Sequence, residues 1–303
     1  MNSARVRAYL MLLVVAAIWG IATPVIKYTL EGFSPLIFLT YRFGISTFIA
    51  FIIFAINGVH LPKDRKTLLI LFLYGFLNSV VSLGLLFFGM ENTTVLESSL
   101  ITLASPLIIS TAGVYFLHEH VTRREKIGMG IAIIGTILTI IEPLINNGHS
   151  VLKLSGNLLI LGYVLVTVVT TIFAKNLLRK DTDAMAMTNF SFIIGFLSFL
   201  PFVLFSNFSL TKIFEVHYTY HLGVFFMAVL SGTFAFYLAN KAQKTIEVGE
   251  QALFAYLYPV FSLPLAVLWL GEKITPIYVL GGVIIAIGVV IAEIKKRRYN
   301  SVS

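Results

Sequence analysis

Cysteine is absent from this 303-residue chain, and charged residues are scarce at 12%. Without cysteine there is no disulfide framework, no thiolate metal ligand and no cysteine nucleophile. A soluble globular protein carries about 25% charged residues, roughly twice the fraction found here. Hydrophobic residues make up 58% of the chain, which leaves too little polar surface for a soluble domain. The composition therefore indicates an integral membrane protein.

Motifs for nucleotide hydrolysis and for common hydrolases are also missing. The chain has no G-x-x-x-x-G-K-[ST] phosphate loop, and neither G-x-S-x-G nor H-E-x-x-H occurs. The run His118-Glu119-His120 looks like a metal site, but two histidines two residues apart do not share a helix face. We therefore predict no enzymatic activity, no metal site, no cofactor and no direct coupling to ATP.

Long apolar runs, separated by charged or Pro-, Gly- and Asn-rich breaks, divide the chain. A hydrocarbon core of about 30 Å requires roughly 20 helical residues, and segments of about that length recur throughout. The run after Arg5 and Arg7 continues without a clear cleavage site, so we interpret it as a helix rather than a signal peptide. We predict ten transmembrane helices, at 8–28, 35–56, 67–89, 94–117, 126–142, 155–177, 184–206, 221–241, 249–270 and 276–294.

Basic residues fall in the connections between these segments, and alternate connections carry them. In the ten-helix arrangement, 17 lysines and arginines lie on one side of the membrane and 4 on the other. Because basic residues near helix ends favour the cytoplasm, we predict that both termini are cytoplasmic. This topology accounts for the net charge of +8, so lipid and not nucleic acid is the expected environment.

Two parts of the chain are related by an internal repeat. Residues 97–135 align without a gap to 250–288, with 11 identities in 39 positions. The informative identities are Glu97 with Glu250, Pro106 with Pro259, Glu119 with Glu272, Thr122 with Thr275, Gly128 with Gly281 and Gly135 with Gly288. We predict two five-helix repeats, 1–147 and 148–303. Because five is odd, the second copy enters the membrane inverted, an arrangement that predicts alternating access to a site near the midplane.

The doubled pattern, together with Trp19-Gly20, Lys27 and Arg42, resembles EamA-type members of the drug/metabolite transporter superfamily. The resemblance covers essentially the whole chain. It implies an all-α, ten-helix carrier of the bacterial inner membrane, and such carriers often export amino acids or other small metabolites. It does not specify the cargo.

Polar residues gather in a subset of the expected helices. Lipid offers hydroxyl and amide groups no partner, so we expect these groups to line a watered cavity. For any single hydroxyl, a bond to its own helix backbone is the alternative. The predicted cavity residues are Trp19, Thr23, Asn78, Ser82, Thr102, Tyr163, Thr167, Thr233, Tyr237, Asn240 and Tyr256. Aromatic rings and amides with few charges suit a neutral or zwitterionic, amphipathic solute.

Two lysine–glutamate pairs are candidates for gating and coupling. Lys27 and Lys175 end the first and sixth expected helices, whereas Glu97 and Glu250 begin the fourth and ninth. We hypothesise that Lys27 pairs with Glu97 to close the outer mouth. Lys175 would pair with Glu250 at the inner mouth, and either glutamate could couple a proton to transport. Alternatively, the lysines snorkel to headgroups and the glutamates cap helix starts.

Arg42 lies deep within an expected helix, where a charge costs about 2.5–3.5 kcal/mol on insertion scales. It has two open roles, as a structural anchor or as a binder of the cargo's carboxylate. We group it with the gating and coupling residues.

Small residues recur at helical spacing in the fifth and tenth expected helices. Gly128 with Ala132, and Gly282 with Ala286, permit close backbone approach. Packing within the fold and a homodimer seam are both open interpretations. The whole pattern predicts a secondary transporter that exports small molecules. The alternative is a non-transporting membrane receptor or assembly scaffold, for which the repeat provides no reason.

Overall fold

The fold is described here from a computed structural model, over residues 3–59, 61–117, 123–145, 150–205 and 211–293. These residues form helices joined by short connections, with no strand among them. The helices are α1 (Ser3–Thr29), α2 (Pro35–Asn57), α3 (Arg65–Gly75), η1 (Phe76–Ser82), α4 (Leu83–Asn92), α5 (Val95–Thr102), α6 (Ser105–Leu117), α7 (Arg123–Ile145), α8 (Ser150–Arg179), α9 (Ala184–Phe205), α10 (Thr211–Glu215), α11 (Tyr218–Ala228), η2 (Val229–Phe234), α12 (Ala235–Gln243), α13 (Val248–Ala252), η3 (Leu253–Leu257), α14 (Tyr258–Leu268) and α15 (Pro276–Glu293). Of the η segments, η1 and η2 are π-helical and η3 is a 3₁₀ turn.

Eight helices in the described part of the chain are long and apolar enough to cross a membrane. Four of them are composite, because α3–η1–α4, α5–α6, α11–η2–α12 and α13–η3–α14 each continue as one span. The fifth and tenth expected helices coincide with α7 and α15, whose apolar stretches, Gly130–Glu142 and Pro276–Ile291, are shorter. The prediction of an all-α membrane protein is confirmed. The count of ten spans and the inverted repeat stay predictions.

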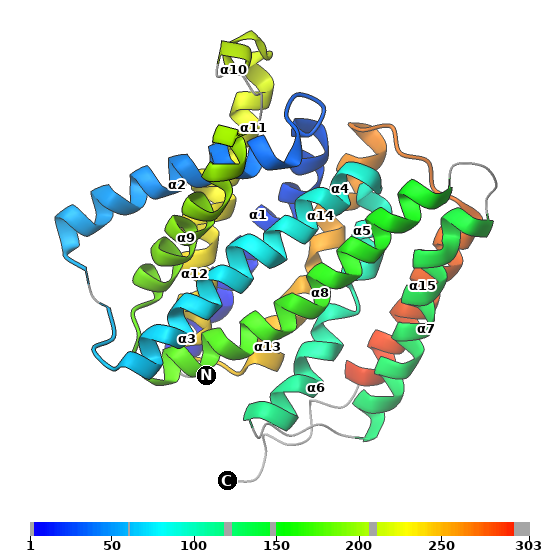
Figure 1. The fold of residues 1–303 in the computed structure, drawn as a ribbon. Coiled ribbons are helices and arrows are strands. Elements are labelled where there is room, and N and C mark those ends of the chain that lie inside the picture. Colours follow the sequence, from blue (N-terminus) through cyan, green and yellow to red (C-terminus); the bar gives the residue numbers. More distant parts are fainter. Residues whose placement is uncertain (1–2, 60, 118–122, 146–149, 206–210, 294–303) are drawn as a thin grey trace.

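Helices α7 and α15 pack against each other at one edge of the bundle (Figure 1). A Cβ atom added to Gly135 would lie 2.8 Å from the carbonyl oxygen of Gly281, and one added to Gly288 would lie 2.6 Å from the amide nitrogen of Ala132. Glycine is therefore required for the close approach of these backbones. Ala132 and its neighbour Gly128 thus serve packing within the fold, and the homodimer seam stays a prediction.

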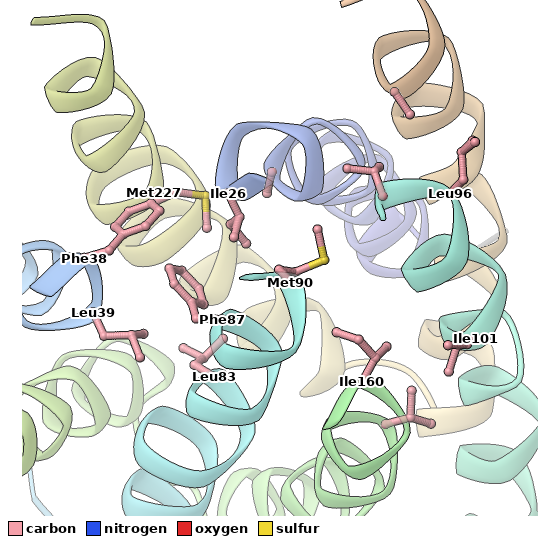
Figure 2. Close-up of a cluster of buried hydrophobic side chains, with 14 of the residues drawn as sticks. Ile26, Phe38, Leu39, Leu83, Phe87, Met90, Leu96, Ile101, Ile160 and Met227 are labelled. Carbon is pink, nitrogen blue, oxygen red and sulfur yellow. The ribbon is translucent and has the colours of Figure 1, made fainter. Parts of the chain in front are cut away.

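The largest apolar cluster surrounds the connection between α4 and α5 (Figure 2). The cluster includes Phe87 and Met90 of α4, Leu96 and Ile101 of α5 and Ile26 of α1, and these five side chains are almost completely buried. We name residues 90–96 the first junction. Because lipid is as apolar as these side chains, the cluster is stabilised by close van der Waals packing rather than by removal of apolar surface from water.

Residues 243–249, which connect α12 to α13, are named the second junction and lie 153 residues further along the chain. The long helix α8 contacts both junctions: Gly156 lies against the backbone of Asn92, and Lys175 donates to the carbonyl of Gln243. Nineteen residues of helix at 1.5 Å each separate Gly156 from Lys175, a distance of about 28 Å. The two junctions therefore lie toward opposite ends of the bundle (Figure 1).

Candidate functional site

A cavity of about 190 Å³ lies inside the bundle, lined mainly by the helices of the first, third, fourth, sixth, eighth and ninth expected spans. Its wall combines aromatic rings with hydroxyl and amide groups. Arg42 is the one charged side chain among the described lining residues. Such a wall offers many hydrogen-bonding groups and little net charge, which fits a small amphipathic solute.

Eight of the eleven predicted cavity residues line this cavity, namely Trp19, Thr23, Asn78, Ser82, Thr102, Tyr163, Thr167 and Asn240. Thr233, Tyr237 and Tyr256 do not. Thr233 donates its hydroxyl to the carbonyl of Ala228 at 3.2 Å, which is the local bond expected as the alternative. Tyr237 instead contacts Lys241, whose ammonium donates to the phenol oxygen at 2.9 Å. Tyr256 lies on the η3 turn next to the lining residue Ala255.

Two π-helical turns shape the cavity wall at repeat-related positions. The first residues of η1 and η2, Phe76 and Val229, are 153 residues apart. A π turn adds a residue to the helix and frees backbone groups, and it is common at functional sites. The indole of Trp19 uses one such group, donating to the carbonyl of Ser231 in η2 at 3.1 Å. The sequence contains no signal for these turns, since the apolar pattern is that of ordinary helices.

The two candidate gating lysines bind helix ends. Lys27 donates from Nζ to the carbonyl oxygens of Met90 at 2.9 Å and Glu91 at 3.2 Å, at the end of α4. Lys175 donates to the carbonyl oxygen of Gln243 at 2.7 Å, at the end of α12, and to that of Ile246. A cation is favoured there because the last carbonyls of a helix are unpaired and carry partial negative charge.

The two candidate gating glutamates have partners that differ from the hypothesised lysines. Glu97 accepts from the Thr93 hydroxyl at 2.8 Å and forms a capping box with Thr94 at the start of α5. Glu250 forms an ion pair with Arg5, and Tyr9 lies 3.5 Å from the same carboxylate oxygen. In this conformation neither glutamate is bonded to its hypothesised lysine, and the alternately formed pairs stay a hypothesis. For Glu97 the contacts match the capping alternative.

Glu272 forms a contact that sequence reasoning missed. Its carboxylate accepts from the amides of Val95 at 2.7 Å and Leu96 at 2.9 Å, and so caps α5 from the connection between α14 and α15. Burial raises the pKa of the Glu272 carboxyl, although these two amide bonds oppose the shift. Its identity with Glu119 in the repeat was the available signal. His118, Glu119 and His120 lie outside the residues that the structure describes. Among the described residues, no group of histidine, aspartate and glutamate side chains could hold a metal ion.

Arg42 is fully buried, and its three guanidinium nitrogens have no hydrogen-bond partner among the described residues. Its central carbon lies 5.2 Å from the ring centre of Phe43, 5.3 Å from that of Phe87 and 6.0 Å from that of Phe192. The aromatic faces attract the cation but do not occupy its N–H groups. The guanidinium is therefore held at the cavity wall with donors unfilled.

Comparison with known proteins identifies the family. The model of the EamA-like transporter family matches residues 6–141 and 154–293. The chain belongs to this family. The resemblance drawn from the residue pattern is thereby confirmed, and the family consists of transporters rather than enzymes.

Curated relatives match nearly the full chain. An uncharacterized transporter of Bacillus subtilis, YetK, is 26% identical over 96% of this chain and 88% of its own length. A Salmonella typhimurium protein named "Probable amino-acid metabolite efflux pump" is 27% identical over 92% of each chain. A crystal structure at 17% sequence identity superposes with a TM-score of 0.68, covering 97% of this chain and 99% of the other, which shows that the fold is shared.

Proposed function

We propose that this EamA-family transporter exports small neutral or zwitterionic metabolites, amino acids foremost, as a secondary carrier that works by alternating access. The observation that supports this most is the cavity itself, with amide and hydroxyl groups beside aromatic rings and one cationic side chain. The name of the Salmonella typhimurium relative agrees with this cargo class.

Alternating access by inverted repeats requires two halves with corresponding parts, and several correspondences support the division at 147 and 148. The π turns η1 and η2 start 153 residues apart. The carbonyl acceptors of the two lysines, Met90 and Gln243, have the same offset. We propose that α7 and α15 complete the ten spans, in spite of their shorter apolar stretches.

The two ends of the cavity support an assignment of state. At the second junction Gln243 and Val248 line the cavity. All four side chains at these corresponding positions are buried, but the counterparts at the first junction, Met90 and Val95, pack in the large apolar cluster and do not line the cavity. We infer that this conformation is sealed at the first junction and accessible toward the second. With the predicted topology, the accessible side is the cytoplasm of a bacterial cell, and the membrane is the inner membrane.

The gating role of the charged residues is proposed in a revised form. Arg5 and Glu250 bridge α1 and α13 close to the second junction, where they can hold the cytoplasmic mouth. Glu97 keeps its proposed place at the outer mouth through Thr93 and Thr94, and Lys27 and Lys175 fix the helix ends beside both mouths. Proton coupling through either glutamate remains part of the proposal.

The test is counterflow in proteoliposomes. Vesicles containing the purified protein are loaded with an unlabelled amino acid or metabolite, and uptake of the labelled solute is followed for each member of a panel. Exchange of at least one zwitterionic solute is expected, and Trp19→Ala, which removes a cavity wall, should abolish it. Trp269→Ala is the matched control, because that indole lies outside the cavity lining and is 44% exposed. A folded protein that exchanges no panel member would contradict the proposal.

A further inference from the structure

Arg42 presents an unsolved electrostatic problem within the bundle. A charge at the centre of a membrane helix costs about 2.5–3.5 kcal/mol on insertion scales, and a long side chain can reduce that cost by reaching a membrane edge. Arg42 does not reach an edge, because its side chain is fully buried and lines the cavity. Its nitrogens are buried and have no partner among the described residues, so a group bound in the cavity would supply their missing acceptor.

The protein supplies no anion to this cation. Among the described residues that line the cavity there is no aspartate or glutamate. The surrounding phenylalanine rings stabilise the positive charge while leaving the N–H groups at its edge free. A guanidinium so arranged keeps its charge and its directional donors for a ligand, and a carboxylate is the group that fits this fork in a bidentate manner.

The position of the fork is fixed by two helices. Arg42 extends from α2 to the π turn η2, where a Cβ atom on Gly232 would lie 2.8 Å from the carbonyl oxygen of Met227 and 3.4 Å from Nη2 of Arg42. The absence of a side chain at Gly232 therefore permits the close approach of the guanidinium to this turn. The next residue back, Ser231, lines the cavity and binds the Trp19 indole through its carbonyl.

We propose that Arg42 is the anchor for the carboxylate of the transported solute, so that the cargo class is amphipathic monocarboxylates, apolar amino acids in particular. The proposal rests on the transport function proposed above. The aromatic rings of Trp19, Tyr163 and Tyr258 provide the apolar wall for the side chain, and the amides of Asn78 and Asn240 provide polar contacts for the remaining groups. A solute carboxylate placed anywhere else along this wall would find no cationic partner among the described lining residues.

The experiment compares an acid with its amide. L-leucine and L-phenylalanine are paired with L-leucinamide and L-phenylalaninamide, which replace the carboxylate by a neutral group of similar size. Binding is read from Trp19 fluorescence in a Trp269→Phe background, since the chain has only these two tryptophans. Counterflow is measured on the same proteins. The parent should prefer each acid over its amide by about tenfold or more, because the amide leaves the buried cation unpaired.

Substitutions at Arg42 assign that preference to the guanidinium. Arg42→Gln should lower acid binding and exchange by about tenfold or more and leave those of the amide within about twofold. Arg42→Lys keeps the charge but not the bidentate fork, so its preference should be intermediate. If Arg42→Gln does not fold, the acid-over-amide preference of Arg42→Lys provides the test. Ser46→Ala is the control, because this neighbouring hydroxyl is bonded to the carbonyl of Ala228 and does not line the cavity.

Failure of this inference differs from failure of the transport proposal. If the parent exchanges acids and amides equally, or if Arg42→Gln keeps the preference for acids, the carboxylate assignment is wrong and the transporter stands. If the folded parent neither exchanges any panel solute nor changes its Trp19 emission with any of them, both proposals are wrong.

Discussion

The first junction and the second junction have corresponding sequences but different surroundings. At the first, a large apolar cluster is joined by buried polar contacts, among them the Thr93 hydroxyl with Asn157 and the Glu272 cap on α5. At the second, the apolar residues form smaller separate clusters, the cavity reaches Gln243, and Arg5 and Glu250 pair at an exposed edge. One repeated pattern is thus packed in two ways, which agrees with the proposed carrier sealed at one end.

The helices that cross each junction show where the difference begins. Gly156 of α8 lies against the first junction, where an added Cβ atom would be 2.8 Å from the carbonyl carbon of Asn92 and 2.9 Å from the amide nitrogen of Thr93. Lys27 and Lys175 are 148 residues apart, and the same offset relates Gly156 to Ala8 of α1. Ala8 packs with Ala242 and Ile246 at the second junction. The methyl group of Ala8, which Gly156 lacks, is therefore the difference between a side-chain contact at the second junction and a backbone contact at the first.

Substituting Gly156→Ala should have the largest effect on this comparison. The added methyl group has no space against backbone atoms, so the first junction must move, at a cost of about 1–3 kcal/mol. The unfolding temperature of the purified protein in detergent measures this. Gly130→Ala is the matched control, because a Cβ atom there meets nothing within 4 Å. It should be neutral or stabilising by up to about 1 kcal/mol. Equal destabilisation by both substitutions would contradict the close approach.

Removing the cap that Glu272 provides should come next. Glu272→Ala leaves two amides of α5 without acceptors, and a loss of about 1–2 kcal/mol is expected in the same unfolding measurement. Lys273→Ala, at the exposed neighbouring position, is the control and should change stability by less than about 0.5 kcal/mol. An unchanged melting temperature in Glu272→Ala would show that α5 does not depend on this cap.

The pH dependence of the same group has a defined sign. Burial raises the pKa of Glu272 above its ordinary 4.5, so the folded protein binds this proton more tightly than the unfolded chain does. The stability from this proton is fully present below pH 4.5 and is lost as pH rises through the raised value. Relative to Glu272→Gln, which cannot titrate, the unchanged protein should therefore lose stability from pH 4 to pH 8. A gain would contradict the raised pKa.

The capping residues of the two junctions provide a smaller difference. Thr94 caps α5 with its side chain, whereas Glu247, 153 residues later, makes no side-chain cap on α13. Thr94→Ala should cost about 1 kcal/mol, and Glu247→Ala should cost less than about 0.5 kcal/mol. Melting temperatures of the two variants test this directly. A larger loss at Glu247 would reverse the comparison.

The ion pair beside the second junction should contribute least. The side chains of Arg5 and Glu250 are 45% and 21% exposed, so Arg5→Ala should change stability by less than about 1 kcal/mol, and the change should shrink as salt is added. If the pair holds the cytoplasmic mouth as proposed, Arg5→Ala should change the rate of solute exchange more than it changes stability. Arg7→Ala is the nearby control. A salt-independent loss above 1 kcal/mol would indicate a buried role.

Much of this architecture follows from residue type and spacing alone. Apolar runs of about 20 residues locate the spans because every backbone group must be bonded within a helix in lipid. Polar residues such as Asn78 and Thr167 locate the cavity wall for the same reason. Thr233 and Tyr237 were misplaced because a hydroxyl has local partners that composition does not reveal.

Other features depend on contacts that spacing cannot predict. The π turns need an extra residue in a helix whose apolar pattern continues through it. Lys27 was assigned to Glu97, yet the carbonyls at the end of α4 are closer partners, and every helix end offers such carbonyls. Glu272 reaches an amide 177 residues away in sequence, so its role appears only once α14 is packed beside α5.

Thiol reactivity at two matched positions tests the central claim of unequal junctions. Val95 and Val248 are the same residue type 153 residues apart, and the chain has no native cysteine to interfere. Val95→Cys and Val248→Cys are each treated, purified in detergent without solute, with a water-soluble methanethiosulfonate reagent. Both valine side chains are fully buried, but Val248 borders the cavity whereas Val95 is packed in the first-junction cluster. A small opening therefore exposes position 248 sooner, and Val248→Cys should react about tenfold faster or more. Equal rates, or faster reaction at position 95, would contradict a carrier sealed at the first junction and accessible toward the second.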